Sequence, residues 1–353
     1  MLKSIVAAAA LAVTAPAAQA QAQAPRISWS IAPEGRGDGS EFQLTIESSW
    51  APGSHSIWSN TRNISELPGL TAGQLRGAPQ PARFALIRDA GRLDCSGTAG
   101  GLTGSGMCAL TPNPAFVSYL AAHGIGQPDA RGLFSLTMSG VGRELIEAMG
   151  QLGYVRPTGD QLAAMGIHGV SPEFVRGLAT SGYRLRSADD LIAFKIHGVD
   201  LDYIRGMAAA GPMLQRLPAD DLVSLRIHGV EPAYVRQMAA IGPEFRNLTA
   251  DNLVSFAIHG VRPELVQAYV RANGRQLNPD DVVSMAIHGV DGEFIGQMAA
   301  LGYRDLSADD LVSLRIHGVT PDYVQSLQRA GMAHLSADQL VRLRLAGFDG
   351  KAN

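Results

Sequence analysis

A four-residue anchor, Ile-His-Gly-Val, recurs six times between residues 167 and 319 and restricts the fold more than any other feature. Its glycines are separated by 29, 31, 31, 29 and 29 residues, a period typical of repeats made from one pair of short helices. Degenerate copies at 139–141 and 346–348 lie 29 residues beyond either end of the series. With a further first helix at 113–122, the pattern predicts about eight helix pairs over residues 113–350.

Capping residues mark the two helices of each repeat. Ser171 is followed by Pro172 and Glu173, which is typical of a helix start because proline suits the first position and a carboxylate suits the positive end of the helix dipole. The second helix begins at Ser187, and Asp190 three residues later is placed to complete a capping box. Helices of about ten residues are marginal alone, so stacking into an α-solenoid is expected.

The anchor histidines and glycines are predicted to form the C-cap of the second helix. A histidine at a helix end can bond the exposed carbonyls, and the glycine after it can adopt the left-handed conformation. Metal binding and a surface pH response are the alternatives, although helix layers about 8–10 Å apart are too widely spaced for zinc ligands. The residues concerned are His168, Gly169, His197, Gly198, His228, Gly229, His259, Gly260, His288, Gly289, His317 and Gly318.

Basic residues recur at two positions of the repeat. Arg176, Arg205 and Arg236 occupy the same place in the first helix, and we treat them as weak candidate binding residues. A second set precedes the anchor and comprises Lys195, Arg226, Arg315 and Arg344. Such stripes indicate either solvated faces with ion pairs between layers or a groove for an acidic ligand.

The segment before the repeats has a different character. Residues 1–20 resemble a signal peptide, with a basic start, a short apolar run and small residues before the expected cleavage site, so a periplasmic or secreted protein without a transmembrane segment is expected. Residues 26–112 show the alternation of apolar and polar residues that favours a β-rich domain, as a sandwich or another small β-fold. Cys95 and Cys108 are expected to form a disulfide within a hairpin. The predicted class is therefore α+β, with a small N-terminal β-domain followed by a helical-pair repeat.

Composition and motifs narrow the possible functions. The net charge of −3 and the predicted export oppose nucleic-acid binding, although the local helix pair resembles a helix-hairpin-helix element. We find no zinc-protease, nucleophile-elbow or phosphate-loop motif, so neither catalysis nor a cofactor is expected. An alternative places a ligand-binding or hydrolase-like site in the β-domain around His55, Trp58 and Arg62.

The repeat unit Tyr-Val-x-x-Met-Ala-x-x-Gly, followed by Leu-Ser-Ala-Asp-Asp-Leu-Val-Ser-Leu-Arg-Ile-His-Gly-Val, resembles repeats of uncharacterised exported bacterial proteins. It is also similar to repeats in the extracytoplasmic tails of some membrane metallopeptidases of the β-lactam-sensor type. The resemblance covers roughly residues 113–348 and implies an extracytoplasmic binding or sensing role. The repetition itself predicts a scaffold that binds a protein, a peptide or an envelope component along the solenoid surface. A regulator of a membrane peptidase is the alternative that the resemblance alone suggests.

Overall fold

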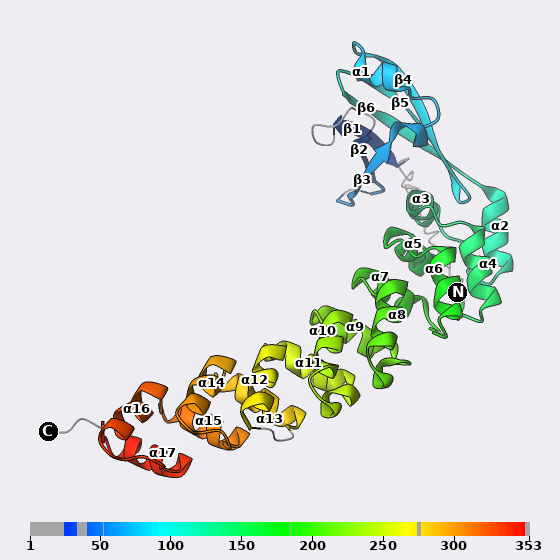
Figure 1. Cartoon of the computed structure of the whole chain (residues 1–353). Helices are drawn as coiled ribbons and strands as arrows, with labels where there is room; N and C mark the ends of the chain where they lie inside the picture. Colours follow the sequence, from blue (N-terminus) through cyan, green and yellow to red (C-terminus); the bar gives the residue numbers. More distant parts are fainter. Residues whose placement is uncertain (1–24, 34–40, 52, 184, 274–276, 350–353) are drawn as a thin grey trace, which may run out of the picture. The chain divides into compact units, whose positions relative to one another are not determined.

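The computed structural model describes residues 25–33, 41–51, 53–183, 185–273 and 277–349 (Figure 1). Within these ranges an antiparallel sheet is followed by a long series of helices, which confirms the predicted α+β layout. The chain divides into two units, residues 1–113 and 114–353. The predicted signal peptide, residues 1–20, lies outside the described residues.

The first unit contains one six-stranded sheet in the order β3-β2-β1-β6-β5-β4, in which every neighbouring pair is antiparallel. The sequence analysis allowed a sandwich of two sheets, but the described residues form a single sheet. The strands are β1 (Arg26–Pro33), β2 (Glu41–Ser49), β3 (Ser56–Asn63), β4 (Gln80–Arg88), β5 (Gly91–Gly100) and β6 (Thr103–Pro112).

Alternation along the strands places the apolar residues on one buried face. Ile27, Trp29 and Ile31 of β1 are at most 2% exposed, because successive side chains of a strand point to opposite sides. The Trp29 ring lies 5.0 Å from that of Phe84 in an edge-to-face contact, and its indole N–H donates to the Ser96 carbonyl at 3.1 Å. The segment between β3 and β4, with η1 (Ile64–Glu66) and α1 (Ala72–Arg76), adds buried leucines such as Leu75.

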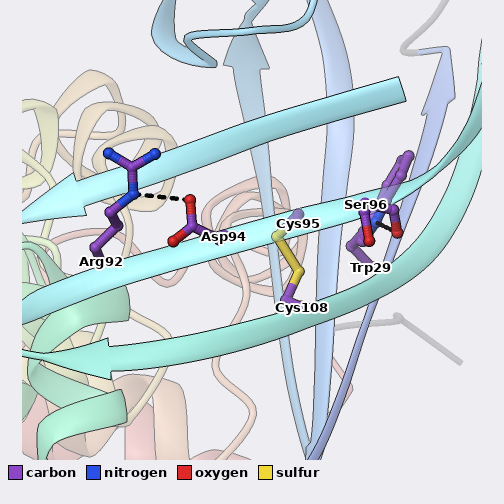
Figure 2. Close-up of a disulfide and its surroundings, with 6 residues drawn as sticks. All are labelled: Trp29, Arg92, Asp94, Cys95, Ser96 and Cys108. Atoms are coloured by element: carbon purple, nitrogen blue, oxygen red, sulfur yellow. Dashed lines mark hydrogen bonds and ion pairs between the residues drawn. A yellow bond between two sulfur atoms is a disulfide. The ribbon is translucent and has the colours of Figure 1, made fainter. Parts of the chain in front are cut away.

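The predicted disulfide is confirmed. Cys95 and Cys108 are directly opposite each other in the register of β5 and β6, and their sulfur atoms are bonded (Figure 2). Arg92 and Asp94 form an exposed ion pair on β5, with 2.7 Å between Nε and Oδ1. The bridge therefore links the strands of one hairpin.

The second unit consists of short helices that contact the helix two places further along the chain. One row contains α3, α5 and the later odd-numbered helices, and the other contains α4, α6 and the later even-numbered ones. The helices are α2 (Pro114–Ala122), α3 (Ala130–Ser139), α4 (Arg143–Gln151), α5 (Gly159–Ile167), α6 (Pro172–Thr180), α7 (Ala188–Ile196), α8 (Leu201–Ala210), α9 (Ala219–Ile227), α10 (Pro232–Ala239), α11 (Ala250–Ile258), α12 (Pro263–Asn273), α13 (Pro279–Ile287), α14 (Gly292–Ala300), α15 (Ala308–Ile316), α16 (Pro321–Arg329) and α17 (Ala337–Leu345).

Contacts at both ends show that neighbouring helices of the odd-numbered row run in the same direction. Near the N-terminal ends of α5 and α7, the Gln161 amide donates to Asp189 Oδ1 at 2.9 Å. At the C-terminal ends of α13 and α15, Arg315 Nε donates to the Gly289 carbonyl at 2.7 Å. The C-terminal ends, which carry the anchors, therefore lie next to one another along the row.

Apolar side chains of each pair are buried against the neighbouring layers. In α6 these are Phe174, Val175 and Leu178, and in α9 they are Leu222 and Leu225. A single pair of helices has no other surface that could cover these residues, so the layers stabilise one another.

The two 31-residue repeats place their extra residues in short 3-10 helices between the paired helices, η2 (Pro212–Leu214) and η3 (Pro243–Asn247). Each insertion carries one buried side chain, Leu214 and Phe245, both 1% exposed. Asp200 still caps α8 before the first insertion and Thr249 still caps α11 after the second, whereas α9 begins after Pro218, which provides no side-chain cap.

Candidate interaction surface

Each anchor forms the same C-terminal cap. The second helix ends at the anchor isoleucine, the histidine is the cap residue, and the glycine adopts a φ between 63° and 71°. At the anchor of α13, the Gly289 N–H bonds the Ala286 carbonyl at 3.2 Å and the Val290 N–H bonds the Met285 carbonyl at 2.9 Å. This pattern of a Schellman motif satisfies carbonyls that the helix leaves unpaired, and it turns the buried Val290 back onto the core.

We expect Gly289→Ala to destabilise the helical unit by about 1–2 kcal/mol, because an L-residue is strained in the left-handed conformation. A Cβ on Gly289 would meet nothing within 4 Å, so strain alone is tested. Gly296→Ala is the matched control, because Gly296 lies within α14 and a Cβ there would meet nothing within 4 Å. We expect this alanine to raise the free energy of unfolding by about 0.5–1 kcal/mol. Urea unfolding followed by helical circular dichroism measures both, and equal gains for the two variants would contradict the cap geometry.

The anchor histidines lie at the helix ends with exposed or half-buried side chains. The ring Nδ1 atoms of His228, His288 and His317 lie 2.7–2.8 Å from the backbone carbonyl four residues earlier. In these repeats the ring bonds a carbonyl near the end of its own helix, the interaction that the capping interpretation expects. Among the residues that the structure describes, no three His, Cys, Asp or Glu side chains gather to form a metal site.

The anchor isoleucines are exposed, which the sequence analysis did not predict. All six are between 52% and 58% exposed, whereas the anchor valines are at most 5% exposed. Because consecutive residues of a helix are rotated by about 100°, Ile227 points about 200° away from the buried Leu225. In all six copies the anchor isoleucine falls outside the apolar face of its helix. This regularity in the sequence could have revealed the exposed surface. We call the strip formed by the anchor isoleucines and histidines the anchor edge, and its isoleucines are Ile167, Ile196, Ile227, Ile258, Ile287 and Ile316.

The basic residues before the anchors cover aromatic rings of the preceding helix. Lys195 Nζ lies 5.0 Å from the ring centre of Phe174, and the Arg226 guanidinium carbon lies 4.7 Å from that of Tyr203. Arg315 and Arg344 cover the equivalent rings of Phe294 and Tyr323 at 4.9 and 5.0 Å. These distances are in the range of cation–π contacts, so this set of cations takes part in packing the layers.

Tyrosines tie the first helix of one repeat to the next anchor. The Tyr203 hydroxyl donates to the Val230 carbonyl at 2.8 Å, and the Tyr234 hydroxyl donates to the Val261 carbonyl at 3.0 Å. Burial raises the pKa of both hydroxyls above the usual range of tyrosine, because desolvation disfavours the phenolate. They are therefore neutral donors at physiological pH.

Arg176, Arg205 and Arg236 lie on the first helices of their repeats, α6, α8 and α10. Arg176 and Arg205 form ion pairs with different kinds of partner. Arg176 bonds Glu144 of α4 across the layers at 3.0 Å, while Arg205 pairs with Asp202 of its own helix. Arg236 is exposed on α10. Ion pairs between exposed groups contribute little to stability.

The residues predicted for a site in the first unit, which we call the β-unit, lie at the edge strand β3. His55 is exposed just before the strand, and Trp58 and Arg62 are half-buried on it. Arg62 bonds Glu66 at 2.8 Å. The pKa of Glu66 is lowered, first by the N–H of Asn63 and then by Arg62. Trp58 and Arg62 share one face of β3, and Arg62 pairs with the Glu66 carboxylate that completes the capping box of η1 with Asn63.

Comparison with protein-family models, with curated proteins and with solved structures finds no match. Among the described helices, none is both long and apolar enough to cross a membrane.

Proposed function

We propose that the helix pairs of residues 113–350 form a solenoid that binds a polypeptide partner along the anchor edge. The observation that carries this proposal is the row of six isoleucines, each more than half exposed, at the same place in every repeat. Exposed apolar surface that recurs in this way is typical of interaction sites, because it costs free energy unless a partner covers it.

The chemistry of the anchor edge favours binding over catalysis. Isoleucine offers apolar area and no reactive group, while the neighbouring imidazoles and backbone groups can accept or donate hydrogen bonds. Layers of packed helices are about 8–10 Å apart, so an extended chain would meet a new isoleucine every two to three residues. A polypeptide therefore fits this spacing better than a compact small molecule.

Export to the periplasm or the medium is part of the proposal. Its support is the signal-like N-terminus together with the Cys95–Cys108 disulfide, since such bridges persist in oxidising compartments. Comparing the mass of the protein recovered from the bacterial envelope with that of the full chain tests this part; an uncleaved cytoplasmic protein would contradict it.

The binding proposal is tested by replacing Ile227, Ile258 and Ile287 together by serine. Affinity capture from envelope extract should lose its specific partner in this variant, because about three buried side chains would be removed from the interface. The matched control replaces Ile87, Val155 and Met213 by serine, three exposed apolar residues outside the anchor edge. Both variants should unfold like the wild type. A partner that the anchor variant retains as well as the control does would overturn the proposal.

A further inference from the structure

The anchor edge repeats at the step of the helix layers. Its six isoleucines are each more than half exposed, and each belongs to one layer of the odd-numbered row. Packed helices lie about 8–10 Å apart, and this distance is therefore the step between neighbouring isoleucines. A partner that covers the whole strip has to present apolar groups at the same step.

One extended or helical segment does not keep this step. Side chains on one face of a β-strand recur about every 6.6 Å, because the residues between them point to the opposite side. One face of an α-helix recurs about every 5.4 Å. Either segment therefore runs out of register with the isoleucines after one or two layers. A second copy of this chain is built from the same repeat, so its own isoleucines keep the same step.

The area of the anchor edge agrees with what a stable dimer needs. Six isoleucines, each more than half exposed, present roughly 400 Å² of apolar surface. A standard interface takes about 800 Å² from each partner, of which a little more than half is apolar. The isoleucines supply most of that apolar part only when all six are covered, and a partner with the same step fulfils this condition.

Charged residues beside the anchor edge distinguish a parallel from an antiparallel pair. Counted from the layer of Ile167, the residue directly after the anchor valine is Glu231 in the third layer and Arg262 in the fourth, and both are exposed. In a parallel pair each of them would face its own counterpart, so like charges would repel. In an antiparallel pair centred between the two layers, Glu231 faces Arg262 of the second copy, and the two-fold symmetry makes this contact twice.

Both side chains are available for this contact. Glu231 precedes α10 without making a side-chain cap bond, and its ion pair with Arg226 leaves carboxylate lone pairs that can accept a second cation. Within the described part of the chain, Arg262 forms no ion pair. A guanidinium that reaches Glu231 across the axis therefore breaks no ion pair of its own copy.

The other layers are compatible with the antiparallel order. The second layer faces the fifth, so Asp200 lies opposite Asp291, and Arg315 balances one of these two charges, with 3.7 Å between its Nη2 and Asp291 Oδ2. The first layer faces the sixth, where Ser171 and Thr320 follow the anchor valines and carry no charge. The charges beside the strip thus favour the antiparallel order at its centre and do not oppose it at its ends.

We propose that the polypeptide bound at the anchor edge is a second copy of this chain, docked antiparallel with the two-fold axis between Ile227 and Ile258. The inference rests on the proposed function, because it names the partner of the same surface. All six isoleucines of each copy are covered in this pair, and the strip keeps no open part for a third copy, so assembly stops at the dimer.

Sedimentation equilibrium of the full protein measures this association. We expect a reversible monomer–dimer equilibrium. Ile227→Ser with Ile258→Ser should raise its dissociation constant at least about tenfold, because four apolar side chains leave the centre of the interface. Val155→Ser with Met213→Ser is the matched control, since both residues are exposed outside the anchor edge. A protein that stays monomeric up to its solubility limit, or a dimer that the isoleucine change leaves intact, would refute the inference.

A charge exchange tests the antiparallel order. Glu231→Arg and Arg262→Glu should each weaken the dimer severalfold, since like charges then face each other across the axis. Mixing the two variants should restore association as a heterodimer, because every arginine at these positions then meets a glutamate. In a parallel pair each single variant would associate as well as the wild type does. Equal dissociation constants for the wild type and both single variants would therefore exclude the antiparallel order.

The inference and the proposed function can fail separately. A protein that is monomeric at all concentrations, while its triple isoleucine variant loses an envelope partner, would refute the second copy and leave the proposed function standing. A dimer that survives the isoleucine change, in a protein whose captured partner also ignores the isoleucines, would refute both. A dimer that is lost with the isoleucines and restored by the mixed charge variants supports both.

Discussion

Gly106→Ala is expected to destabilise the β-unit by about 3 kcal/mol or more, the upper range for overpacking a well-packed core. A Cβ on Gly106 would lie 2.1 Å from the Ser96 carbonyl oxygen, 2.6 Å from Trp29 Nε1 and 2.7 Å from Gly97 Cα. Two of these atoms belong to the backbone of β5, so rotation of a side chain cannot relieve the overlap. Strands β5 and β6 would have to separate where the Trp29 indole bonds Ser96.

Tryptophan fluorescence reports this change selectively, because all three tryptophans, Trp29, Trp50 and Trp58, precede residue 114. Guanidinium unfolding should show an earlier tryptophan transition for Gly106→Ala, with little change in the helical circular dichroism transition. Ser105→Ala is the control, since Ser105 is exposed on the same strand. Unchanged fluorescence transitions in both variants would show that β5 and β6 do not approach this closely.

Local signals in the sequence predict the helices well. Ser187 and Ser307 accept hydrogen bonds from the N–H groups three residues later, as expected, and Ser307 completes a capping box with Asp310. Ser187 lacks the reciprocal bond that was expected from Asp190. Such caps involve residues within one turn, so the sequence contains all of the relevant atoms.

Features that depend on which segments become neighbours were harder to predict. Strand order in the β-unit stayed open because alternation shows which face is buried but not which strands pair. The contact of Arg315 with Phe294 joins two helices, and the stripe of cations alone could not distinguish packing from a ligand groove.

Phe256→Ala is expected to cost about 3–5 kcal/mol in the helical unit, the range for removing a buried phenylalanine. Phe256 is fully buried in α11, and α11 contacts both α9 and α13. The cavity would therefore weaken the packing between successive layers near the middle of the row. Because repeat arrays are stabilised mainly by their nearest neighbours, the helical unfolding transition should broaden as well as move to lower denaturant.

Ile258→Ala provides the contrast, two residues along the same helix. Ile258 is 58% exposed, so its truncation should change the free energy of unfolding by about 0.5 kcal/mol or less. Circular dichroism at increasing urea compares the two variants directly, while tryptophan fluorescence should stay the same in both. Similar losses in the two variants would mean that the anchor isoleucine is part of the core. The anchor edge would then be packing surface, and a partner would have no exposed isoleucines to cover.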